Sequence, residues 1–126
     1  MSLAYARPVV MITTGNRAVA EPFYADTLGL PRGPEDGFAA LFEVSGTTLR
    51  LTEVPGYAAA PYPVLGFEVS DIVAAVDGLV TKGVKMSRYE GLDQDQRGIW
   101  TAPGGHAKVV FFADPDGNLL SLTQPG

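Results

Sequence analysis

Few residues in this chain of 126 could perform familiar catalytic chemistry. It contains no cysteine, which excludes thiol nucleophiles and cysteine-ligated zinc. The single histidine, His106, follows Pro103-Gly104-Gly105 and precedes a strand-like run, where a solvated loop side chain is expected rather than a metal ligand or general base. No Ser-His-Asp constellation, phosphate-binding glycine loop or histidine-rich motif is present. The carboxylates of residues 114–118 belong to an expected structural turn, because the ligand spacing of a calcium loop is missing.

The charge balance disfavours nucleic-acid and membrane partners. Nine Lys and Arg against fourteen Asp and Glu give a net charge of −5, and the pI is about 4.6, whereas duplex binders usually present a clustered basic face. The longest apolar runs, residues 8–12 and 109–113, are far shorter than the roughly 20 residues that a membrane-spanning helix needs. The first seven residues lack the features of a signal peptide. We therefore expect a cytoplasmic protein that has neither type of partner.

The first half of the chain predicts a strand, a helix and a hairpin. Its strands are expected at residues 8–14, 38–44 and 47–54. A helical spacing follows the first strand and stops at Gly29, a residue typical of helix ends. Pro22 predicts that the regular helix begins near Ala20 or is kinked there, because proline removes an internal hydrogen bond. Ser45-Gly46 lies between the last two strands and is typical of a hairpin turn.

The second half follows a connector at residues 55–63, where the apolar residues show neither the helical nor the strand spacing. Its strands are expected at residues 64–69, 84–89, 108–113 and 119–123. Asp71 is placed to cap a helix that has one clean apolar stripe and ends at Gly83. The two halves therefore repeat one order of elements, which we interpret as a βαβββ unit present twice.

Two segments at matching ends of this duplicated pattern carry a family resemblance. Phe23-Tyr24-Ala25-Asp26-Thr27-Leu28-Gly29-Leu30 and the C-terminal run from Phe112 to Leu122 resemble signatures of the glyoxalase/bleomycin resistance/dioxygenase family, also called the vicinal oxygen chelate superfamily. The resemblance covers nearly the whole chain. It implies a single α+β domain over residues 1–126 that consists of two βαβββ modules, at about residues 8–54 and 62–124. The curved mixed sheets of the two modules are expected to surround a cup, with the helices on the outside. It also implies a homodimer that holds a small molecule, often together with a divalent metal.

The metal ligands of such enzymes come from four strand positions, and each can be compared with this sequence. The resemblance assigns these positions to Val9, Arg50, Val64 and Ser121. Valine has no donor atom, and a guanidinium lacks a lone pair for a cation and repels it. Divalent metals need several N, O or S donors at about 2.0–2.5 Å. We therefore expect neither a metal nor a cofactor.

The lining of the implied cup follows from strand alternation. If Val9 and Val64 face inward, that side is shared by Met11, Thr13, Thr48, Thr52, Gly66, Glu68, Leu119 and Thr123. The alternate residues are apolar and are expected to pack beneath the helices. The candidate ligand-binding residues are Val9, Met11, Arg50, Val64, Glu68, Tyr89, Trp100 and Ser121. Small residues, hydroxyl groups and two charges are a lining typical of a ligand site.

Each candidate also has a structural interpretation. Arg50 either pairs with Glu68 or binds an anionic part of the ligand. Tyr89 and Trp100 bracket a polar loop and form either an aromatic wall of the site or part of the core or a dimer interface. The loop at residues 90–98 is interpreted as solvated, with a lid as the alternative.

The missing metal donors favour a metal-free protein that binds a small molecule. The small molecule is expected to be anionic if Arg50 contacts it. The alternative is an enzyme of the same superfamily, a lyase, isomerase, dioxygenase or transferase that works with atypical residues such as Glu68. A third possibility is a fold retained only for protein association, which a cup filled by its own side chains would favour. The substrate stays open, because this fold supports many chemistries.

Overall fold

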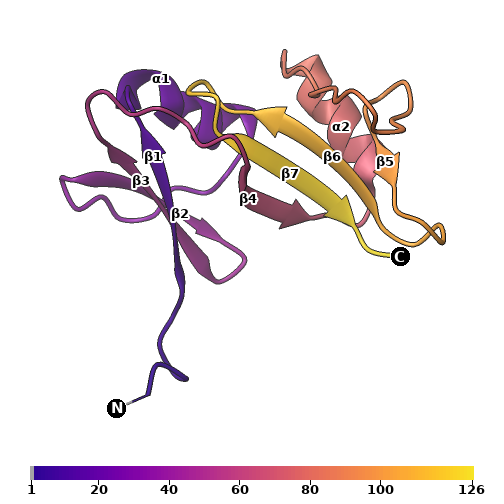
Figure 1. Ribbon diagram of the computed structural model, residues 1–126. Helices are drawn as coiled ribbons and strands as arrows, with labels where there is room; N and C mark the ends of the chain where they lie inside the picture. Colours follow the sequence, from indigo (N-terminus) through magenta and orange to yellow (C-terminus); the bar gives the residue numbers. More distant parts are fainter. Residues whose placement is uncertain (1) are drawn as a thin grey trace. The chain divides into compact units, whose positions relative to one another are not determined.

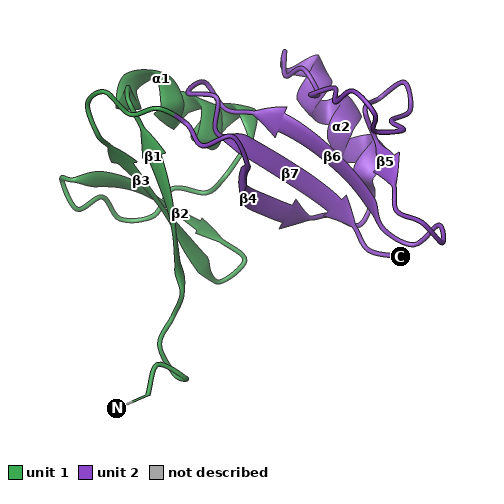
Figure 2. Ribbon diagram, viewed as in Figure 1, with its two compact units in different colours: residues 1–58 green, residues 59–126 purple. Residues whose placement is uncertain are grey.

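Two compact units make up the chain, and each is described by itself. The computed structural model describes residues 2–126, and the units are residues 1–58 and 59–126 (Figure 2). The boundary between them falls inside the connector predicted at residues 55–63. Each unit contains one β-sheet and one helical region (Figure 1).

The first unit has a three-stranded sheet in the order β1-β3-β2. Its elements are β1 (Val9–Thr14), α1 (Arg17–Pro22), the π-helix η1 (Phe23–Thr27), β2 (Ala39–Val44) and β3 (Thr47–Glu53). Strand β3 pairs in parallel with β1 and antiparallel with β2. Ser45 and Gly46 have φ values of 49° and 83°, so the predicted hairpin is confirmed as a turn with two left-handed residues.

The second unit has a four-stranded sheet in the order β4-β7-β6-β5. Its elements are β4 (Pro63–Glu68), α2 (Ile72–Thr81), β5 (Trp100–Thr101), β6 (Lys108–Ala113) and β7 (Leu119–Gln124). The predicted helix is confirmed at both ends. The Asp71 side chain accepts a hydrogen bond of 3.1 Å from the backbone N–H of Ala74, and Gly83 has a φ of 91° just beyond the helix.

The same strand connections occur in both units, and the predicted α+β class with two mixed sheets is confirmed. In each unit the first strand runs parallel to the last, and the last pairs antiparallel with the strand before it. In each unit the segment after the helix adds an isolated bridge to the strand next to the last, at Arg32–Phe42 in one unit and Met86–Phe112 in the other, and the second unit has a further bridge at Gln94–Trp100. The repeated unit is therefore found with one of its strands reduced to a bridge.

The strand predicted at residues 84–89 is wrong beyond that bridge. Ser87 still donates its N–H to the carbonyl of Phe111, at 2.8 Å. However, the Gln94 side chain accepts a bond from the N–H of Tyr89 and donates one to the carbonyl of Ser87. These backbone groups are thus satisfied by a side chain, and the ladder cannot continue.

Of the two alternatives predicted for the first helix, a start near Ala20 or a kink there, the start near Ala20 is wrong. Helix α1 begins at Arg17, because the carbonyl of Asn16 accepts from Ala20 and the N–H of Arg17 donates to the Glu53 carboxylate at 2.8 Å. Pro22 is the last residue of α1 and has no N–H to donate, and the α-helical pattern ends at this residue. The helical path continues as the π-helix η1, and Gly29 follows it with a φ of 71°.

The predicted alternation along the strands places the core correctly. Ile12, Leu49, Leu51, Leu120 and Leu122 are all buried. Their neighbours in sequence on the same strands are half-buried or exposed. Each sheet therefore has one apolar face packed inside its unit and one more open face, as period-two patterning requires.

Candidate functional site

One face of the sheet in the second unit packs against α2, and the opposite face is open. Val110 and Leu120 from the strands and Ile72 and Val76 from α2 are all buried. The Gln124 side chain at the end of β7 accepts a 2.9 Å hydrogen bond from the N–H of Ile72, which holds the start of the helix on the sheet. This packing leaves the other face of the sheet as the candidate ligand surface.

Two rows of paired residues cross this open face. Gly66, Ser121 and Phe111 make the first row. The second row consists of Glu68, Thr123, Val109 and Trp100. Residues paired across neighbouring strands project to the same side of a sheet. The structure therefore brings together three predicted site residues: Glu68, Trp100 and Ser121.

Tyr89 joins this face through an aromatic contact. Its ring meets the ring of Phe111 edge-on, with centroids 5.5 Å apart and planes at 90°. A Cβ atom on Gly66 would lie 2.9 Å from the Ser121 hydroxyl oxygen, so the serine side chain occupies the space over that glycine. Val64 lies where the pairing of β4 and β7 shifts register, and the residue is 37% exposed. The surface thus combines an aromatic wall, a small hydroxyl centre and one carboxylate.

The loop at residues 90–98 is largely exposed but is anchored at several points. The Gln94 amide donates to the carbonyls of Ser87 and Gly98 at 3.0 and 2.9 Å, while its oxygen accepts from Tyr89 at 2.8 Å. The Asp95 carboxylate accepts from the backbone N–H groups of Arg97 and Ile99, both at 2.9 Å. This network favours a fixed loop over a lid, and it holds the backbone of Tyr89 in place.

The first unit also has an open sheet face, and three predicted site residues lie on its strands. Val9 and Met11 on β1 are 50% and 65% exposed. Met11, Arg50 and Leu41 form one row across the three strands. Val9, Met11 and Leu41 give this face apolar parts, and Arg50 lies between Met11 and Leu41 in the row.

Arg50 has a partner that the sequence analysis did not anticipate. Its Nη1 lies 2.5 Å from Oδ2 of Asp36, in the loop before β2. The same carboxylate accepts hydrogen bonds from the N–H groups of Phe38 and Ala39, at 2.9 and 3.0 Å. The pKa of Asp36 is held below its ordinary value, and the largest cause is the hydrogen bond from the Phe38 N–H. The hydrogen bond from Arg50 is the second cause. The sequence suggested Glu68 as the ion-pair partner of Arg50. In the structure the partner is Asp36, which is closer in the chain.

Three residues that shape these surfaces were missed: Asp36, Phe111 and Gln94. Phe111 could have been found, because alternation along the predicted strand at residues 108–113 sets it on the side of Val109. Asp36 carries a weaker signal, an Asp-Gly pair before a strand that is typical of a turn. Nothing in the spacing of Gln94 predicts its three bonds, which depend on how the loop folds back.

The positions that the family resemblance assigns to metal ligands do not fit a divalent ion. Val9, Arg50 and Val64 supply no donor atom, and Ser121 supplies one neutral hydroxyl. Across residues 2–126, no three His, Asp or Glu side chains gather closely enough to hold a metal. His106 is exposed in the turn before β6, as expected. These donors therefore support neither Lewis-acid chemistry nor metal storage on the open faces.

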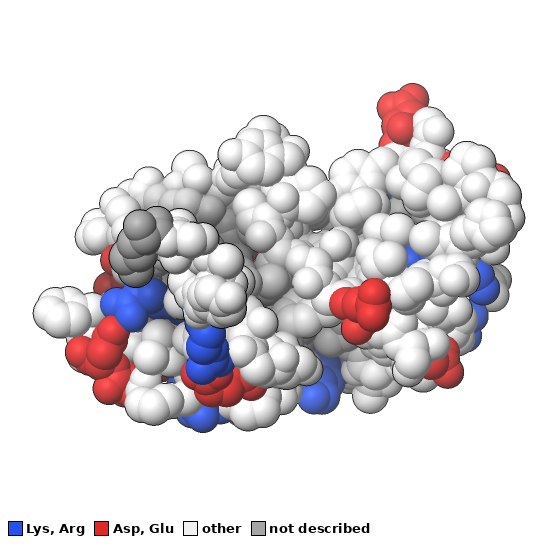
Figure 3. Space-filling view, turned by 90° about the horizontal axis from the view of Figure 1, so that it is seen from below, with Lys and Arg blue, Asp and Glu red and all other residues white. Residues whose placement is uncertain are grey.

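Basic side chains are largely matched by acidic ones. Arg17 pairs with Glu21 and Glu35, and Arg32 also contacts Glu21. In the face drawn in Figure 3, basic side chains lie beside acidic ones, and much of the surface carries neither. This intermixing is unlike the continuous basic stripe that follows a phosphate backbone.

Among the described helices, none combines the length and apolarity that crossing a bilayer requires.

Comparison with known proteins agrees with this architecture. The family model for the glyoxalase/bleomycin resistance protein/dioxygenase superfamily matches residues 7–122. A Bacillus anthracis protein described as glyoxalase family has a similar structure, with a TM-score of 0.77, 15% identity and coverage of 100% of this chain and 99% of that one. The fosfomycin resistance protein FosX from Listeria monocytogenes gives a TM-score of 0.72 at 11% identity, covering 94% and 92%.

A lactoylglutathione lyase from Agrobacterium tumefaciens has a TM-score of 0.63 at 22% identity, with 95% of this chain and 93% of that one covered. These identities show a shared fold and carry no activity over to this protein. No protein with curated annotation matches the sequence. The match of the family model over nearly the whole chain shows that the protein belongs to the glyoxalase/bleomycin resistance protein/dioxygenase superfamily.

Proposed function

We propose that this protein binds a small organic molecule without a metal ion, and that the open face of the sheet in the second unit supplies the contacts. The observation that carries the proposal is the composition of the open face in the second unit. Ser121 and Gly66 provide a small polar centre, and Tyr89 and Phe111 form an aromatic edge beside it. Ligand sites combine such apolar walls with a few polar groups that set orientation.

The proposed ligand has an aromatic or otherwise flat apolar part and at least one hydrogen-bonding group. Aromatic side chains such as Tyr89 and Trp100 offer large apolar contact areas at low conformational cost. On the open sheet face of the first unit, Arg50 is the group proposed to contact an anion. Asp36 already takes one of its five donors and offsets its charge, so a ligand anion would compete with that carboxylate.

The second candidate is an enzyme, and one observation favours it. Glu68 lies on the open face, is exposed, and has no hydrogen-bond or ion-pair partner within the second unit. A carboxylate so placed is available as a general acid or base. The lactoylglutathione lyase among the similar structures shows that this fold can support an enzyme.

We further propose that the protein acts as a cytoplasmic homodimer. Strands β1 and β4 are edge strands of their sheets, and Val9 and Met11 on β1 leave much of their apolar surface exposed. Edge strands with exposed apolar residues favour association. Light scattering coupled to size exclusion at micromolar concentration should give a mass near twice the 13.3 kDa of the chain. A monomer under these conditions would contradict the proposal.

The function is tested by identifying what copurifies with the protein. The protein is purified without an affinity tag, denatured, and its extract examined by mass spectrometry, with elemental analysis of the same sample. Gly66→Leu would project a side chain onto the open face, where a Cβ already meets Ser121. Gly78→Leu is the matched control, because a Cβ at that exposed position of α2 meets no atom within 4 Å.

We expect a small molecule in the wild-type and Gly78→Leu extracts that is lost from Gly66→Leu. Stoichiometric metal that disappears on changing Ser121 or Glu68 would overturn the metal-free proposal. Turnover of the identified molecule that is abolished by Glu68→Gln, with binding retained, would instead establish the enzyme.

A further inference from the structure

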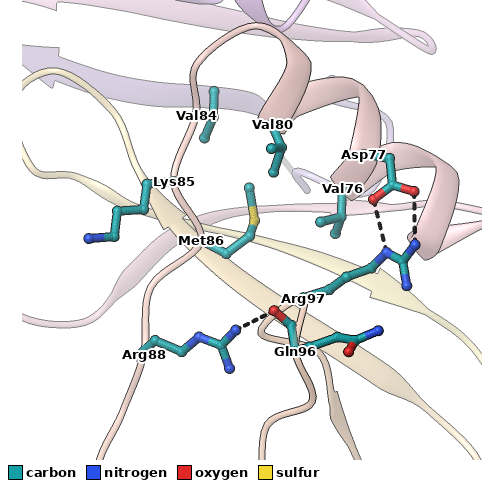
Figure 4. A pocket seen from close by; sticks show the side chains of 9 residues that line it. All are labelled: Val76, Asp77, Val80, Val84, Lys85, Met86, Arg88, Gln96 and Arg97. Carbon is teal, nitrogen blue, oxygen red and sulfur yellow. Dashed lines mark hydrogen bonds and ion pairs between the residues drawn. The ribbon is translucent and has the colours of Figure 1, made fainter.

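A separate pocket of about 380 Å³ lies beside α2 in the second unit (Figure 4). Four apolar side chains form its floor: Val76, Val80, Val84 and Met86. Val76 and Met86 are buried, while Val80 leaves 53% of its surface exposed. The floor is thus continuous with the core at one end and open to solvent at the other. None of its residues belongs to the open sheet face described above.

The rim of this pocket is basic although the protein as a whole is acidic. Lys85, Arg88 and Arg97 supply three of the nine Lys and Arg residues of the chain. Asp77 is the single carboxylate among the lining residues. Three cations against one anion leave a local charge of +2, in a chain whose net charge is −5.

The partners of these groups decide which cations are available. Arg97 is matched by Asp77 through two bonds of 2.9 and 3.1 Å, and Asp77 in turn raises the pKa of Arg97. Arg88 donates to the backbone carbonyls of Asp95 and Gln96, which fix the guanidinium but carry no net charge to offset it. No ion pair among residues 2–126 compensates its charge, although the Asp95 carboxylate is close enough to act on the neighbouring Arg97.

Lys85 is the second uncompensated cation. Its ammonium has no hydrogen-bond or ion-pair partner among residues 2–126, and the residue is exposed. Figure 4 shows Lys85 and Arg88 on one side of the pocket, the Asp77–Arg97 pair on the other, and Met86 between them. The pocket therefore has one cationic side next to an apolar floor.

We propose that this pocket binds an amphipathic organic anion, with its charged group at Lys85 and Arg88 and its apolar body over Met86 and Val80. Charge-assisted hydrogen bonds from Arg and Lys are the stronger ones available to a carboxylate or phosphate. Burying the apolar body over the floor adds about 25 cal/mol per Å² removed from water. A volume of about 380 Å³ lies in the range of small-molecule sites.

The test uses octanoate as the anionic probe and octanamide as its neutral counterpart. Methyl resonances of Val76, Val80, Val84 and Met86 are followed by NMR during each titration. We expect octanoate to shift these methyls and to bind about tenfold more tightly than octanamide, with the difference shrinking at high salt. Equal affinities for the two probes would overturn the proposal, as would octanoate shifts centred on Phe111, Ser121 and Thr123.

Two variants sharpen the result. Lys85→Gln should weaken octanoate binding about three- to tenfold and leave octanamide unchanged. Val80→Asp should weaken octanoate further, because it adds a like charge to an exposed part of the floor. Lys108→Gln is the matched control, since it removes the same charge from a residue that does not line the pocket. A loss of octanoate affinity as large in Lys108→Gln as in Lys85→Gln would mean that net charge, and not the pocket, holds the anion.

Discussion

Arg50 and Asp36 are joined by an ion pair, 2.5 Å from Nη1 to Oδ2, that connects the open face of β3 to the loop preceding β2. The carboxylate also accepts from Phe38 and Ala39, so it closes a local turn while it orients the guanidinium. Arg50 is consequently held in position before any ligand arrives. A ligand anion that reaches it must share or displace Asp36.

The Asp36 interactions predict a dependence of stability on pH. The pKa of Asp36 is held below its ordinary value of 3.8 in the folded protein, first by the Phe38 N–H and then by Arg50. The stabilisation is therefore fully present above the unfolded pKa, near pH 4, and is lost as the pH falls through the lower folded value.

Thermal melts from pH 7 to about pH 2.5 check this expectation. Asp36→Ala should melt at a lower temperature than wild type at pH 7, and the gap should close on acidification. Arg50→Met should lose only part of the effect, because the backbone bonds to Asp36 remain. A gap that stays constant over the whole range would show that the carboxylate charge contributes nothing.

Gln94 is expected to matter more for stability than its place in a loop suggests. Gln94→Leu removes three hydrogen bonds, to Tyr89, Ser87 and Gly98. At about 0.5–1.5 kcal/mol each, the loss of unfolding free energy should be about 1.5–4.5 kcal/mol, with faster amide exchange at Tyr89. Chemical denaturation and hydrogen exchange measure the two effects.

Gln96→Leu is the matched control for that loop. The Gln96 side chain makes no hydrogen bond with residues 2–126, and only its carbonyl accepts, from Arg88. Its variant should remain within about 0.5 kcal/mol of wild type. Equal losses in the two variants would indicate that the loop tolerates no leucine, and the role assigned to Gln94 would be withdrawn.

Thr52 offers a substitution that should stabilise the protein. Its hydroxyl oxygen is buried and has no hydrogen-bond partner among the described residues. An unsatisfied buried polar group costs about 1–3 kcal/mol, and valine has the same branched shape. Thr52→Val should therefore raise the unfolding free energy by about 1 kcal/mol in denaturant titrations.

Thr48 lies on the same strand and provides the contrast. Its hydroxyl donates a 2.9 Å hydrogen bond to the Glu43 carboxylate. Thr48→Val should lower the unfolding free energy, because that hydrogen bond is lost and the substitution removes no unsatisfied buried hydroxyl in return. Stabilisation by both substitutions would point to strand propensity and not to the unsatisfied group.

The turn after β6 is predicted to be one of the least tolerant parts of the chain. Asp114 is buried, and it accepts from the N–H groups of Asp116 and Asn118 and from the Asn118 amide, at 2.8 to 2.9 Å. Asp114→Ala should cost about 2–4 kcal/mol, because it leaves the buried Asn118 amide without this acceptor. Asp93→Ala, at an exposed loop position, should cost less than about 0.5 kcal/mol.

Elements whose signal lies in neighbouring residues were predicted from the sequence alone. The α2 helix follows from its Asp71 cap, its apolar stripe and Gly83, all within fifteen residues. The hairpin at Ser45-Gly46 and the structural turn at residues 114–118 are equally local. Burial on one face of each strand follows from alternation, and the same alternation sets Glu68 and Ser121 on one surface.

The sequence could not decide which of several possible partners a given polar group would bind. The backbone at Ser87 and Tyr89 has strand-like residues, yet Gln94 folds back from a loop and takes its hydrogen bonds. Arg50 could have paired with any carboxylate on a nearby surface, and the hairpin brings Asp36 within reach of it. The cationic side of the α2 pocket likewise exists only because the segment after the helix brings Lys85 and Arg88 to the edge of an apolar floor that includes Val76 and Val80 of α2.

The sequence by itself therefore determined most of the order of the elements, the buried faces of the strands and the lack of a metal-donor set at Val9, Arg50, Val64 and Ser121, because each depends on residue type and short spacing. Tertiary structure decided which polar groups are satisfied and which remain available. Hydrogen bonds and ion pairs act over about 3 Å, so their pairing depends on the final path of loops whose residues lie far apart in the chain.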